Sequence, residues 1–251
     1  MLAPSPLTAT SRSKPEERAK LLAARYAGLD GADFLRPLIK TEFPGRIALV
    51  SSFGTESAVL LALAAEADPA VPVLFIDTGK LFGETLRYRD QLVARLGLTD
   101  VRTIRPDPGA LSRLDSDGML WNRDVDGCCG VRKVAPLDKA LKEFDAWISG
   151  RKRFQSSTRA AIPGIEASEE GHIKINPLAL WDRERLDLEF TRRALPRHPL
   201  EADGFPSVGC YTCSARVEPG ADPRSGRWAG MAKTECGIHR PSRSQNNGAD
   251  I

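Results

Sequence analysis

The sequence has no long apolar run, no apolar leader and little net charge. No stretch approaches the roughly 20 consecutive apolar residues that a membrane-spanning helix requires. The first residues, MLAPSPLTATSRSKPEERAK, lack the apolar segment of a secretory signal, and a net charge of +3 is too small to indicate binding of nucleic acid. We therefore expect a cytoplasmic protein whose partners are neither membranes nor nucleic acids.

Cysteine is also scarce: the chain has five, an odd number that does not suggest the disulfide framework of a small secreted protein. Cys128 and Cys129 are neighbours, and a disulfide between neighbours would be strained. Cys210 and Cys213 follow later in the chain. Four thiolates suit either a tetrahedral zinc ion or an iron–sulfur cluster. Because adjacent cysteines reach two corners of one small tetrahedron poorly, we favour the cluster and keep zinc as the alternative.

The composition, 41% hydrophobic and 27% charged over 251 residues, is that of an ordinary globular protein. This length allows one large domain, alone or with a smaller appendage. Residues 1–15 are rich in Pro, Ser and Thr, so we expect them to be disordered. Residues 16–215 are expected to form one α/β domain, and residues 216–251, which begin with a Gly- and Pro-rich stretch, a mobile tail.

The spacing of apolar residues predicts alternating strands and helices. Two helices come first, over residues 16–29 and 31–43. Predicted strands then cover residues 46–54, 71–79, 100–106, 145–150 and 173–179, and predicted helices cover residues 55–68, 84–97, 134–144 and 185–195. This alternation is typical of right-handed βαβ units, so we predict an α/β fold with an open, mostly parallel sheet flanked by helices.

Polar loops follow the first two predicted strands. The first loop reads SSFGTES, and the second lies within FIDTGKLF. Ligands of open α/β sheets bind at the carboxyl ends of strands, where hydroxyls and free backbone N–H groups form an anion cradle. A plain turn in which Ser52 or Thr55 caps a helix explains the first loop equally well. Neither the G-K-[ST] ending of a phosphate-binding P-loop nor G-x-G-x-x-G is present.

The fifth cysteine, Cys236, lies in KTECGIH near the end of the chain. Basic neighbours stabilise a thiolate, and Lys233 and His239 are nearby, but Glu235 opposes this effect. From these residues alone, an unreactive surface cysteine is the simpler interpretation.

Eight stretches, taken together and in order, resemble one family, the assimilatory sulfonucleotide reductases, and in particular the iron–sulfur reductases of adenosine 5′-phosphosulfate (APS). They are SSFGTES, LFIDTGKLFGETLRYRDQL, DGCCGVRKVAPL, WISGRKRFQSSTRA, LPRHPL, GCYTC, GRWAG and ECGIH. The resemblance runs from about residue 47 to residue 239. The adjacent cysteines, the later C-x-x-C and the E-C-G-I-H tail form a very specific combination.

The resemblance implies a fold like that of adenine nucleotide alpha hydrolases, related to the PP-loop enzymes. It implies reduction of APS to sulfite and AMP by a thioredoxin or glutaredoxin-like dithiol, on the route of sulfate assimilation toward cysteine. Cys236 would be the nucleophile that forms an S-sulfocysteine intermediate. The resemblance also implies a 4Fe–4S cluster held by Cys128, Cys129, Cys210 and Cys213.

The same resemblance assigns nine further residues to the substrate. They are Ser51, Ser52 and Gly54 for the phosphosulfate cradle, Ile76 and Thr78 for the adenosine, Lys133 between cluster and sulfate, and Arg159, Arg224 and Arg227 for the phosphosulfate oxygens. The chain departs from the family pattern at Phe154, where a polar or acidic residue is expected, and in the spacing of SSTRA. Lys152 and Arg153 are interpreted as solvated basic residues beside a strand end.

Three alternatives remain at this stage. The substrate could be the 3′-phosphorylated compound (PAPS), although reductases confined to PAPS usually lack the cluster cysteines. The protein could be an ATP-using PP-loop ligase, but that loop reads S-G-G-x-D-S, and Phe53 and Glu56 replace a glycine and the acid here. A zinc-binding module without catalytic activity is the third. The sequence leaves the oligomeric state open, a homo-oligomer included.

Overall fold

A computed structural model describes residues 14–231, 233 and 235–239 of the protein. In these residues six strands form one sheet in the order β3-β2-β1-β4-β6-β5. All neighbouring pairs are parallel except β5 with β6, which is antiparallel. The strands are β1 (Ile47–Ser51), β2 (Val73–Ile76), β3 (Val101–Ile104), β4 (Ala146–Ile148), β5 (Ile165–Ala167) and β6 (Ile173–Ile175). The predicted open, mostly parallel sheet is confirmed.

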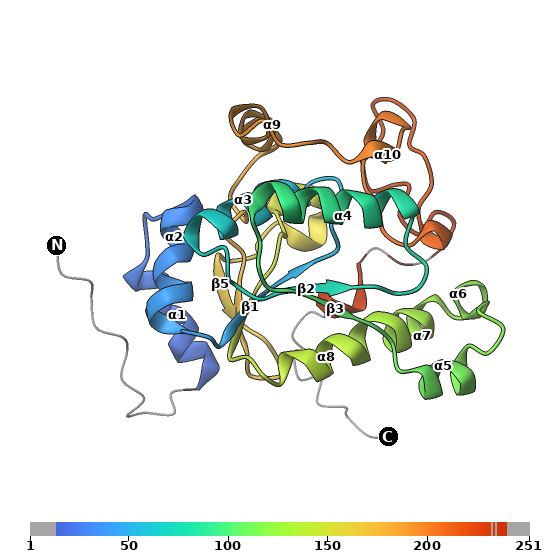
Figure 1. Ribbon diagram of the computed structural model, residues 1–251, viewed down its shortest axis with the longest axis horizontal. Coiled ribbons are helices and arrows are strands. Elements are labelled where there is room, and N and C mark those ends of the chain that lie inside the picture. The colour runs from blue at the N-terminus through green and yellow to red at the C-terminus, as the bar shows by residue number, and fades with distance from the viewer. Residues whose placement is uncertain (1–13, 232, 234, 240–251) are drawn as a thin grey trace, which may run out of the picture.

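Helices cover both faces of this sheet, with α3 and α4 on one side of the strands and α7 and α8 on the other (Figure 1). The α-helices are α1 (Pro15–Arg25), α2 (Gly31–Pro37), α3 (Ser57–Ala67), α4 (Gly83–Leu96), α5 (Pro108–Leu114), α6 (Leu120–Arg123), α7 (Val125–Cys129), α8 (Ala135–Leu141), α9 (Arg183–Arg192) and α10 (Pro199–Ala202). The predicted strands and helices are all present. The elements α5, α6, α7, α10 and β5 were not predicted, because three to seven residues are too few to reveal a period.

Alternate residues of the central strands enter two separate cores. Leu49 and Phe75 belong to the core that includes α1 to α4 and α9, whereas Val50 and Leu74 belong to the core that includes α8. Successive side chains of a strand point to opposite faces, so strands buried on both faces are apolar throughout. This explains the unbroken apolar runs in the sequence. Because β1 is parallel to β2 and to β4, the loops after these three strands emerge at the same edge of the sheet.

The neighbouring cysteines lie at the end of α7, where the chain continues through a π-helical turn, Gly130–Val134, into α8. Such π turns inside helices are frequent at functional sites. Arg132 of this turn is buried. It donates from Nε to Asp115 Oδ2 at 2.8 Å and from Nη1 to the carbonyl of Thr78 at 2.7 Å. These bonds fix the cysteine-bearing helix against the loop that follows β2.

The chain beyond the C-x-x-C motif folds back on that motif. Ser214 and Arg227 form an isolated antiparallel bridge, and the backbone N–H of the buried Trp228 donates to the carbonyl of Cys213 at 3.1 Å. Most of the predicted disordered N-terminus, and residues 240–251 of the predicted tail, lie outside the described residues; Pro15 is the first residue of α1.

None of the helices in the described part of the chain is long and apolar enough to cross a bilayer.

Candidate functional site

A cavity of about 550 Å³ lies where the loops after β1, β2 and β4 meet. The sequence predicted ten residues as nucleophile or substrate ligands, and all ten line this cavity. They are Ser51, Ser52, Gly54, Ile76, Thr78, Lys133, Arg159, Arg224, Arg227 and Cys236. The parallel strands bring the first five together, and the segment after the C-x-x-C motif supplies three of the others.

The turn after β1 leaves the start of α3 without a side-chain cap. The hydroxyl of Thr55 donates to the carbonyl of Pro206 at 2.8 Å, and that of Ser51 accepts the N–H of Phe53 at 3.1 Å. The interpretation of Ser52 or Thr55 as a simple helix cap was therefore wrong. Uncapped N–H groups at the start of a helix are suited to bind an anion.

Thr78, in the loop after β2, connects the cavity to the cysteines. Its Oγ1 lies 3.2 Å from Cys210 Sγ and accepts the N–H of Lys80 at 3.2 Å. Leu81 and Cys210 form an antiparallel bridge, and Tyr211 donates its N–H to the carbonyl of Lys80 at 2.9 Å. The C-x-x-C loop is thus tied to the second strand's loop, although about 130 residues separate them.

Four of the five cysteines are buried, and all five are free thiols. Consecutive helical residues point about 100° apart, and the neighbouring cysteines accordingly have different surroundings. Burial raises the pKa of Cys128, Arg132 opposes this rise, and Cys210 and Cys213 add to it. The pKa of Cys129 is raised by its hydrogen bond with Cys236 and by burial. The two cysteines therefore have different sulfur neighbours.

Lys133 lies among these sulfur atoms. Burial by itself would lower the pKa of its ammonium group, but the electrostatic effect of the nearby sulfur atoms of Cys210, Cys236 and Cys129 outweighs burial and raises the pKa. A charged ammonium next to several sulfur atoms favours their ionised form.

The Cys236 thiol has a pKa well below the ordinary value. The hydrogen bond from Cys129 is the largest cause; burial opposes it, and the positive charges of Lys133 and Arg227 add to the lowering. The expected opposition from Glu235 is weakened, because that carboxylate is held by Arg159. Cys236 is therefore not a fully exposed surface cysteine: the residue is only partly exposed, and it lines the cavity.

Arg227 presents a guanidinium with spare hydrogen-bonding capacity. Its Nη1 donates to the carbonyl of Val208 at 2.9 Å, and the group lies 4.7 Å from the ring centroid of Trp228. The buried Nε of Arg227 has no hydrogen-bond partner among the described residues. Burial lowers the pKa of both Arg224 and Arg227. An anion in the cavity would relieve the cost of burying these charges.

Lys152 is fully buried, so its interpretation as a solvated residue was wrong, whereas Arg153 is exposed as expected. Lys152 Nζ donates to Glu56 Oε2 at 2.8 Å and to the carbonyl of Gly150 at 3.0 Å. Glu56 also pairs with Arg183 at 3.0 Å and accepts from Gln155 at 2.7 Å. No sequence signal indicates this group, because its members come from three segments that only the fold brings together.

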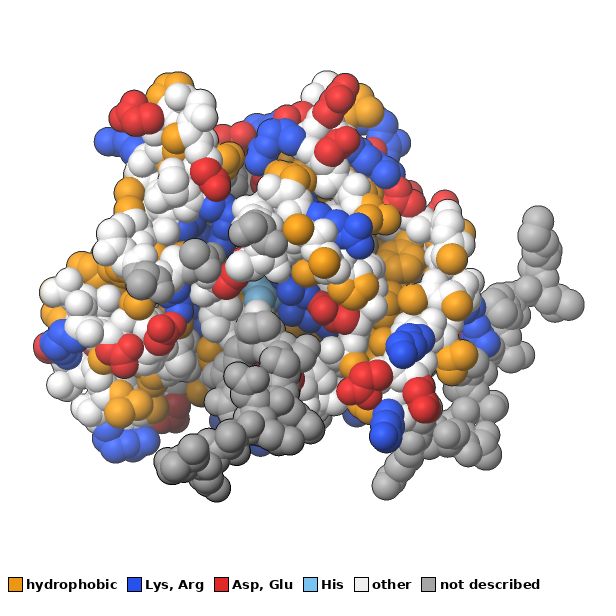
Figure 2. All heavy atoms as spheres, turned by 180° about the vertical axis from the view of Figure 1, so that it is seen from behind, with side chains coloured by type: hydrophobic (Ala, Val, Ile, Leu, Met, Phe, Trp, Pro, Cys, Tyr) orange, Lys and Arg blue, Asp and Glu red, His pale blue; other side chains and the backbone are white. Residues whose placement is uncertain are grey.

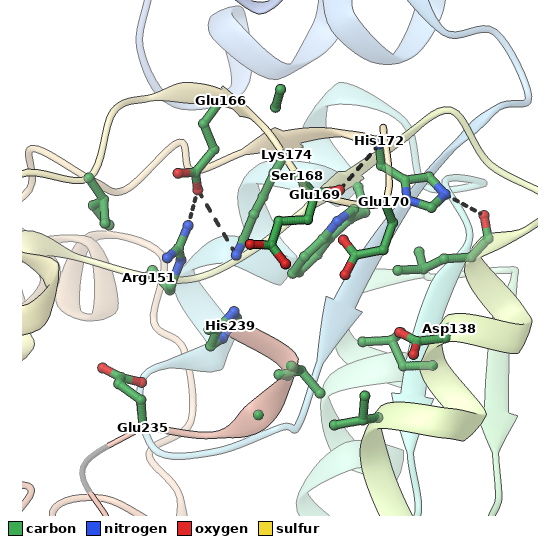
Figure 3. A pocket seen from close by; sticks show the side chains of 18 of the residues that line it. Asp138, Arg151, Glu166, Ser168, Glu169, Glu170, His172, Lys174, Glu235 and His239 are labelled. Atoms are coloured by element: carbon green, nitrogen blue, oxygen red, sulfur yellow. Dashed lines mark hydrogen bonds and ion pairs between the residues drawn. The ribbon is translucent and has the colours of Figure 1, made fainter. Parts of the chain in front are cut away.

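A second cavity, of about 920 Å³, lies on the other side of the tail segment 235–239. Figure 3 shows Glu235 and His239 of this segment pointing into the cavity, with His239 next to Arg151 and Lys174. Burial and the charge of Arg151 lower the pKa of Lys174 to about 7, against the opposing effect of Glu166. Arg151, Arg159 and the tail line both cavities.

On the face opposite to that of Figure 1, Lys and Arg side chains gather around a central hollow (Figure 2).

In the described residues, no three His, Cys, Asp or Glu side chains form a group that could hold a metal ion. A tetrahedral zinc site needs four ligands within about 2.3 Å of one ion. In an iron–sulfur cluster the cysteine ligands are spread over several iron atoms, so they need not all meet at one ion.

Comparisons with known proteins agree with this geometry. Residues 46–216 match the phosphoadenosine phosphosulfate reductase domain. An APS reductase from Mesorhizobium japonicum is 52% identical over 87% of this chain and 88% of its own, and one from Chelativorans sp. is 46% identical over 95% of both. A phosphoadenosine 5′-phosphosulfate reductase from Gloeobacter violaceus is 41% identical over 78% of this chain and 83% of its own.

Solved structures give the same result. The phosphoadenylyl-sulfate reductase of Candida auris is 27% identical, with a TM-score of 0.67 over 84% of this chain and 99% of its own. Yeast FAD synthetase, 16% identical with a TM-score of 0.52 over 81% of this chain and 76% of its own, shares only the fold. The predicted relation to the PP-loop fold is therefore confirmed. The match to the domain and the identity with curated reductases establish that the chain belongs to the PAPS/APS reductase family.

Proposed function

We propose that this protein is an APS reductase of sulfate assimilation. It reduces APS to sulfite and AMP with a thioredoxin or glutaredoxin-like dithiol, and the sulfite serves cysteine synthesis. One observation carries the proposal: Cys236 lines the same cavity as the nine residues predicted to bind the substrate, while the other four cysteines are buried next to it. The names of relatives that are 52% and 46% identical support APS as the substrate.

The reaction begins with attack of the Cys236 thiolate on the sulfur atom of APS. A sulfur–sulfur bond forms, the bond from that sulfur to the bridging phosphate oxygen breaks, and AMP leaves with the electron pair. Cys236 then carries an S-sulfonate group. One thiolate of the donor attacks the Cys236 sulfur and releases sulfite, and the second donor thiol resolves the mixed disulfide. The donor dithiol is thereby oxidised to a disulfide and supplies both electrons.

The charged residues of the cavity favour each step. The positive charges of Lys133 and Arg227 act on Cys236 and favour the ionised form of its thiol. When AMP leaves, negative charge grows on the phosphate oxygens, and fixed guanidinium groups stabilise such charge without reorganising. We assign Arg159, Arg224 and Arg227 to this task, since all three line the cavity with Cys236.

The remaining substrate contacts are assigned to residues of the loops after β1 and β2. We propose that Ser51, Ser52 and Gly54 hold the phosphosulfate at the uncapped start of α3. The backbone around Ile76 and Thr78 would bind the adenosine. Residues 50–52, 54–57, 149–152 and 154–156 line the same cavity, which is large enough for a nucleotide.

We propose a 4Fe–4S cluster as the cofactor. Its ligands would be Cys128, Cys129, Cys210 and Cys213, which fit because they are buried free thiols from two segments, the end of α7 and the C-x-x-C motif, that lie close to each other. Bound there, the cluster would supply a fixed charge beside Lys133 and hold the two segments together.

The domain division is also a proposal. Residues 16–215 would form the nucleotide-binding domain with the cluster site, and residues 216–251 would form a mobile tail that carries Cys236. Cys236 is linked to the domain through a Gly- and Pro-rich stretch, which supports movement of this segment.

PAPS is the second candidate substrate, because the 41% identical relative from Gloeobacter violaceus is named for it. We prefer APS because the chain has the four cluster cysteines. The ratio of kcat/KM for the two substrates decides between them. For a PP-loop ligase, we expect no ATP-dependent release of pyrophosphate; Glu56, at the position of the loop's acid, is already engaged with Lys152 and Arg183.

The proposal is tested with two variants purified without oxygen. Cys236→Ser is expected to keep the iron and sulfide content of the wild type, but to form neither the S-sulfonate adduct nor sulfite. Cys210→Ser is expected to lose the iron. Sulfite production by Cys236→Ser at the wild-type rate would refute the assignment of the nucleophile, and an iron-free wild type with full activity would refute the cluster.

A further inference from the structure

Glu235, immediately before the nucleophile, makes the strongest contacts of the tail. Its carboxylate accepts two parallel hydrogen bonds from Arg159, at 2.6 Å from Nε to Oε1 and at 2.7 Å from Nη2 to Oε2. Ser156 and Thr158 donate to Oε1 at 3.1 and 3.2 Å, and Arg224 lies 3.8 Å from Oε2. A bidentate pair of this kind fixes orientation as well as distance.

The guanidinium of this pair has little freedom of its own. Arg159 is buried, with its side chain 8% exposed, and its Nη1 donates to Gln155. Gln155 in turn donates to Glu56, which pairs with Lys152 in the loop after β4. The partner of Glu235 is therefore held by the rigid part of the fold.

The tail is also held on the other side of Cys236. A side chain at Gly237 would approach Val134 Cγ2 to 3.2 Å, so glycine allows the tail to lie close to the π turn. Ile238 packs against the core of α8, and His239 stacks on Trp147 with ring centroids 5.9 Å apart and planes within 8°. These contacts are mainly apolar and lie beyond the nucleophile. The polar contacts that precede it are the Glu235 pair and the ion pair of Lys233 with Asp126.

From this geometry we infer that Glu235 is a positioning residue: its pair with Arg159 holds the tail closed, so that the Cys236 sulfur lies beside Lys133 and Arg227. The inference rests on the proposed function and goes beyond it. Because Arg159 also lines the substrate cavity, one guanidinium couples the tail to the place where the phosphosulfate would bind.

If Glu235 competed with the substrate for Arg159 and did not position the thiol, the Glu235 variant would have different kinetics. If its carboxylate only occupied the guanidinium until the substrate displaced it, removing the charge would tighten substrate binding. If it positions the thiol, removing the charge must slow the sulfur transfer and leave substrate binding nearly unchanged.

The test compares Glu235→Gln with Glu218→Gln, an exposed glutamate of the same C-terminal segment that serves as the matched control. Sulfonation of Cys236 by APS is followed by mass spectrometry in a single turnover without a thiol donor. For Glu235→Gln, the rate at saturating APS is expected to fall about 10- to 100-fold, as for the loss of strong charged hydrogen bonds. The half-saturating concentration of APS is expected to change less than about threefold, and the control to behave as the wild type.

A second measurement needs no substrate. Alkylation of Cys236 by iodoacetamide, followed on its own peptide, is measured at about pH 10, where an ordinary thiol is already ionised and the rate reports access. Glu235→Gln is expected to react at least about tenfold faster than the wild type, because the tail opens more often.

Two results would overturn the inference: an unchanged sulfonation rate with tighter APS binding, or an unchanged alkylation rate. Failure of the proposed function would look different. The wild type itself would form no adduct with APS, while the alkylation rates would still decide whether Glu235 holds the tail.

Discussion

At the scale of single residues, the cavity holds many more cationic than anionic side chains. Its lining includes the basic residues Lys133, Arg151, Lys152, Arg159, Arg183, Arg224 and Arg227, and the acidic residues Glu56 and Asp222. Glu56 compensates Lys152 and Arg183, whereas the Nε of Arg227 has no partner among the described residues. The excess of positive charge therefore lies on the Arg227 side, next to Cys236, which is where the sulfur transfer is proposed.

His198 gives a prediction about pH. Its Nδ1 accepts the N–H of Leu200 at 3.2 Å, so the ring proton of the neutral form lies on Nε2, 3.1 Å from Thr85 Oγ1. Burial lowers the pKa of His198 to about 4. Between about pH 6.5 and 4, the unfolded chain binds a proton that the folded chain does not, so stability is lost as the pH falls through this range.

The measurement is the free energy of unfolding in urea at several pH values. Between pH 6.5 and 4, the wild type is expected to lose roughly 3 kcal/mol more than His198→Gln. Equal pH dependence in wild type and His198→Gln would contradict the prediction.

At the scale of elements, the π turn before α8 depends on one buried ion pair. Asp115 has no exposed side-chain surface and Arg132 has 9%, whereas the nearby pair of Asp117 and Arg123 is about half exposed. Removing one partner of a buried pair leaves the other charge uncompensated. The contacts of Arg132 with the β2 loop make this pair important for the position of the cysteine helix.

The two aspartates are a matched pair for mutation. Asp115→Asn is expected to lower the free energy of unfolding by about 3–5 kcal/mol, because Arg132 remains buried without its counter-charge. Asp117→Asn should cost less than about 1 kcal/mol, since its pair with Arg123 is solvated. Urea titration of both variants checks this, and similar losses in the two would show that burial does not control the effect.

At the scale of the whole molecule, the strand order decides where a ligand binds. The central strand β1 has β2 on one side and β4 on the other, and the loops after all three line the cavity. A nucleotide bound there would contact the loops after three adjacent strands of the sheet. Its binding energy therefore adds to the stability of the domain as a unit.

Thermal unfolding of the anaerobically purified protein provides the check. AMP at a hundred times its Kd is expected to stabilise the fold by about 2.7 kcal/mol, which raises Tm by several degrees. Uridine monophosphate, which has the same phosphate and a different base, should have a much smaller effect. Equal shifts with both nucleotides, or none with AMP, would argue against adenosine binding at the loop after β2.

The sequence by itself determined the alternation of strands and helices, because the apolar period is a local property of the chain. It also determined the set of cysteines and the loops at the strand ends, whose spacing and composition are visible without a structure. The short elements α5, α6, α7, α10 and β5 carry too few residues for a period, so only packing fixes them.

Only the tertiary structure decided which charges meet. Arg159 and Glu235 are 76 residues apart, and Lys152 and Glu56 are 96 apart, yet each pair forms a direct hydrogen bond. From the sequence, Glu235 opposed an activated thiol and Lys152 was a solvated residue. Electrostatic effects depend on distance and burial in space, and sequence separation gives neither. The fold therefore decides how each of these charged groups acts on its neighbours.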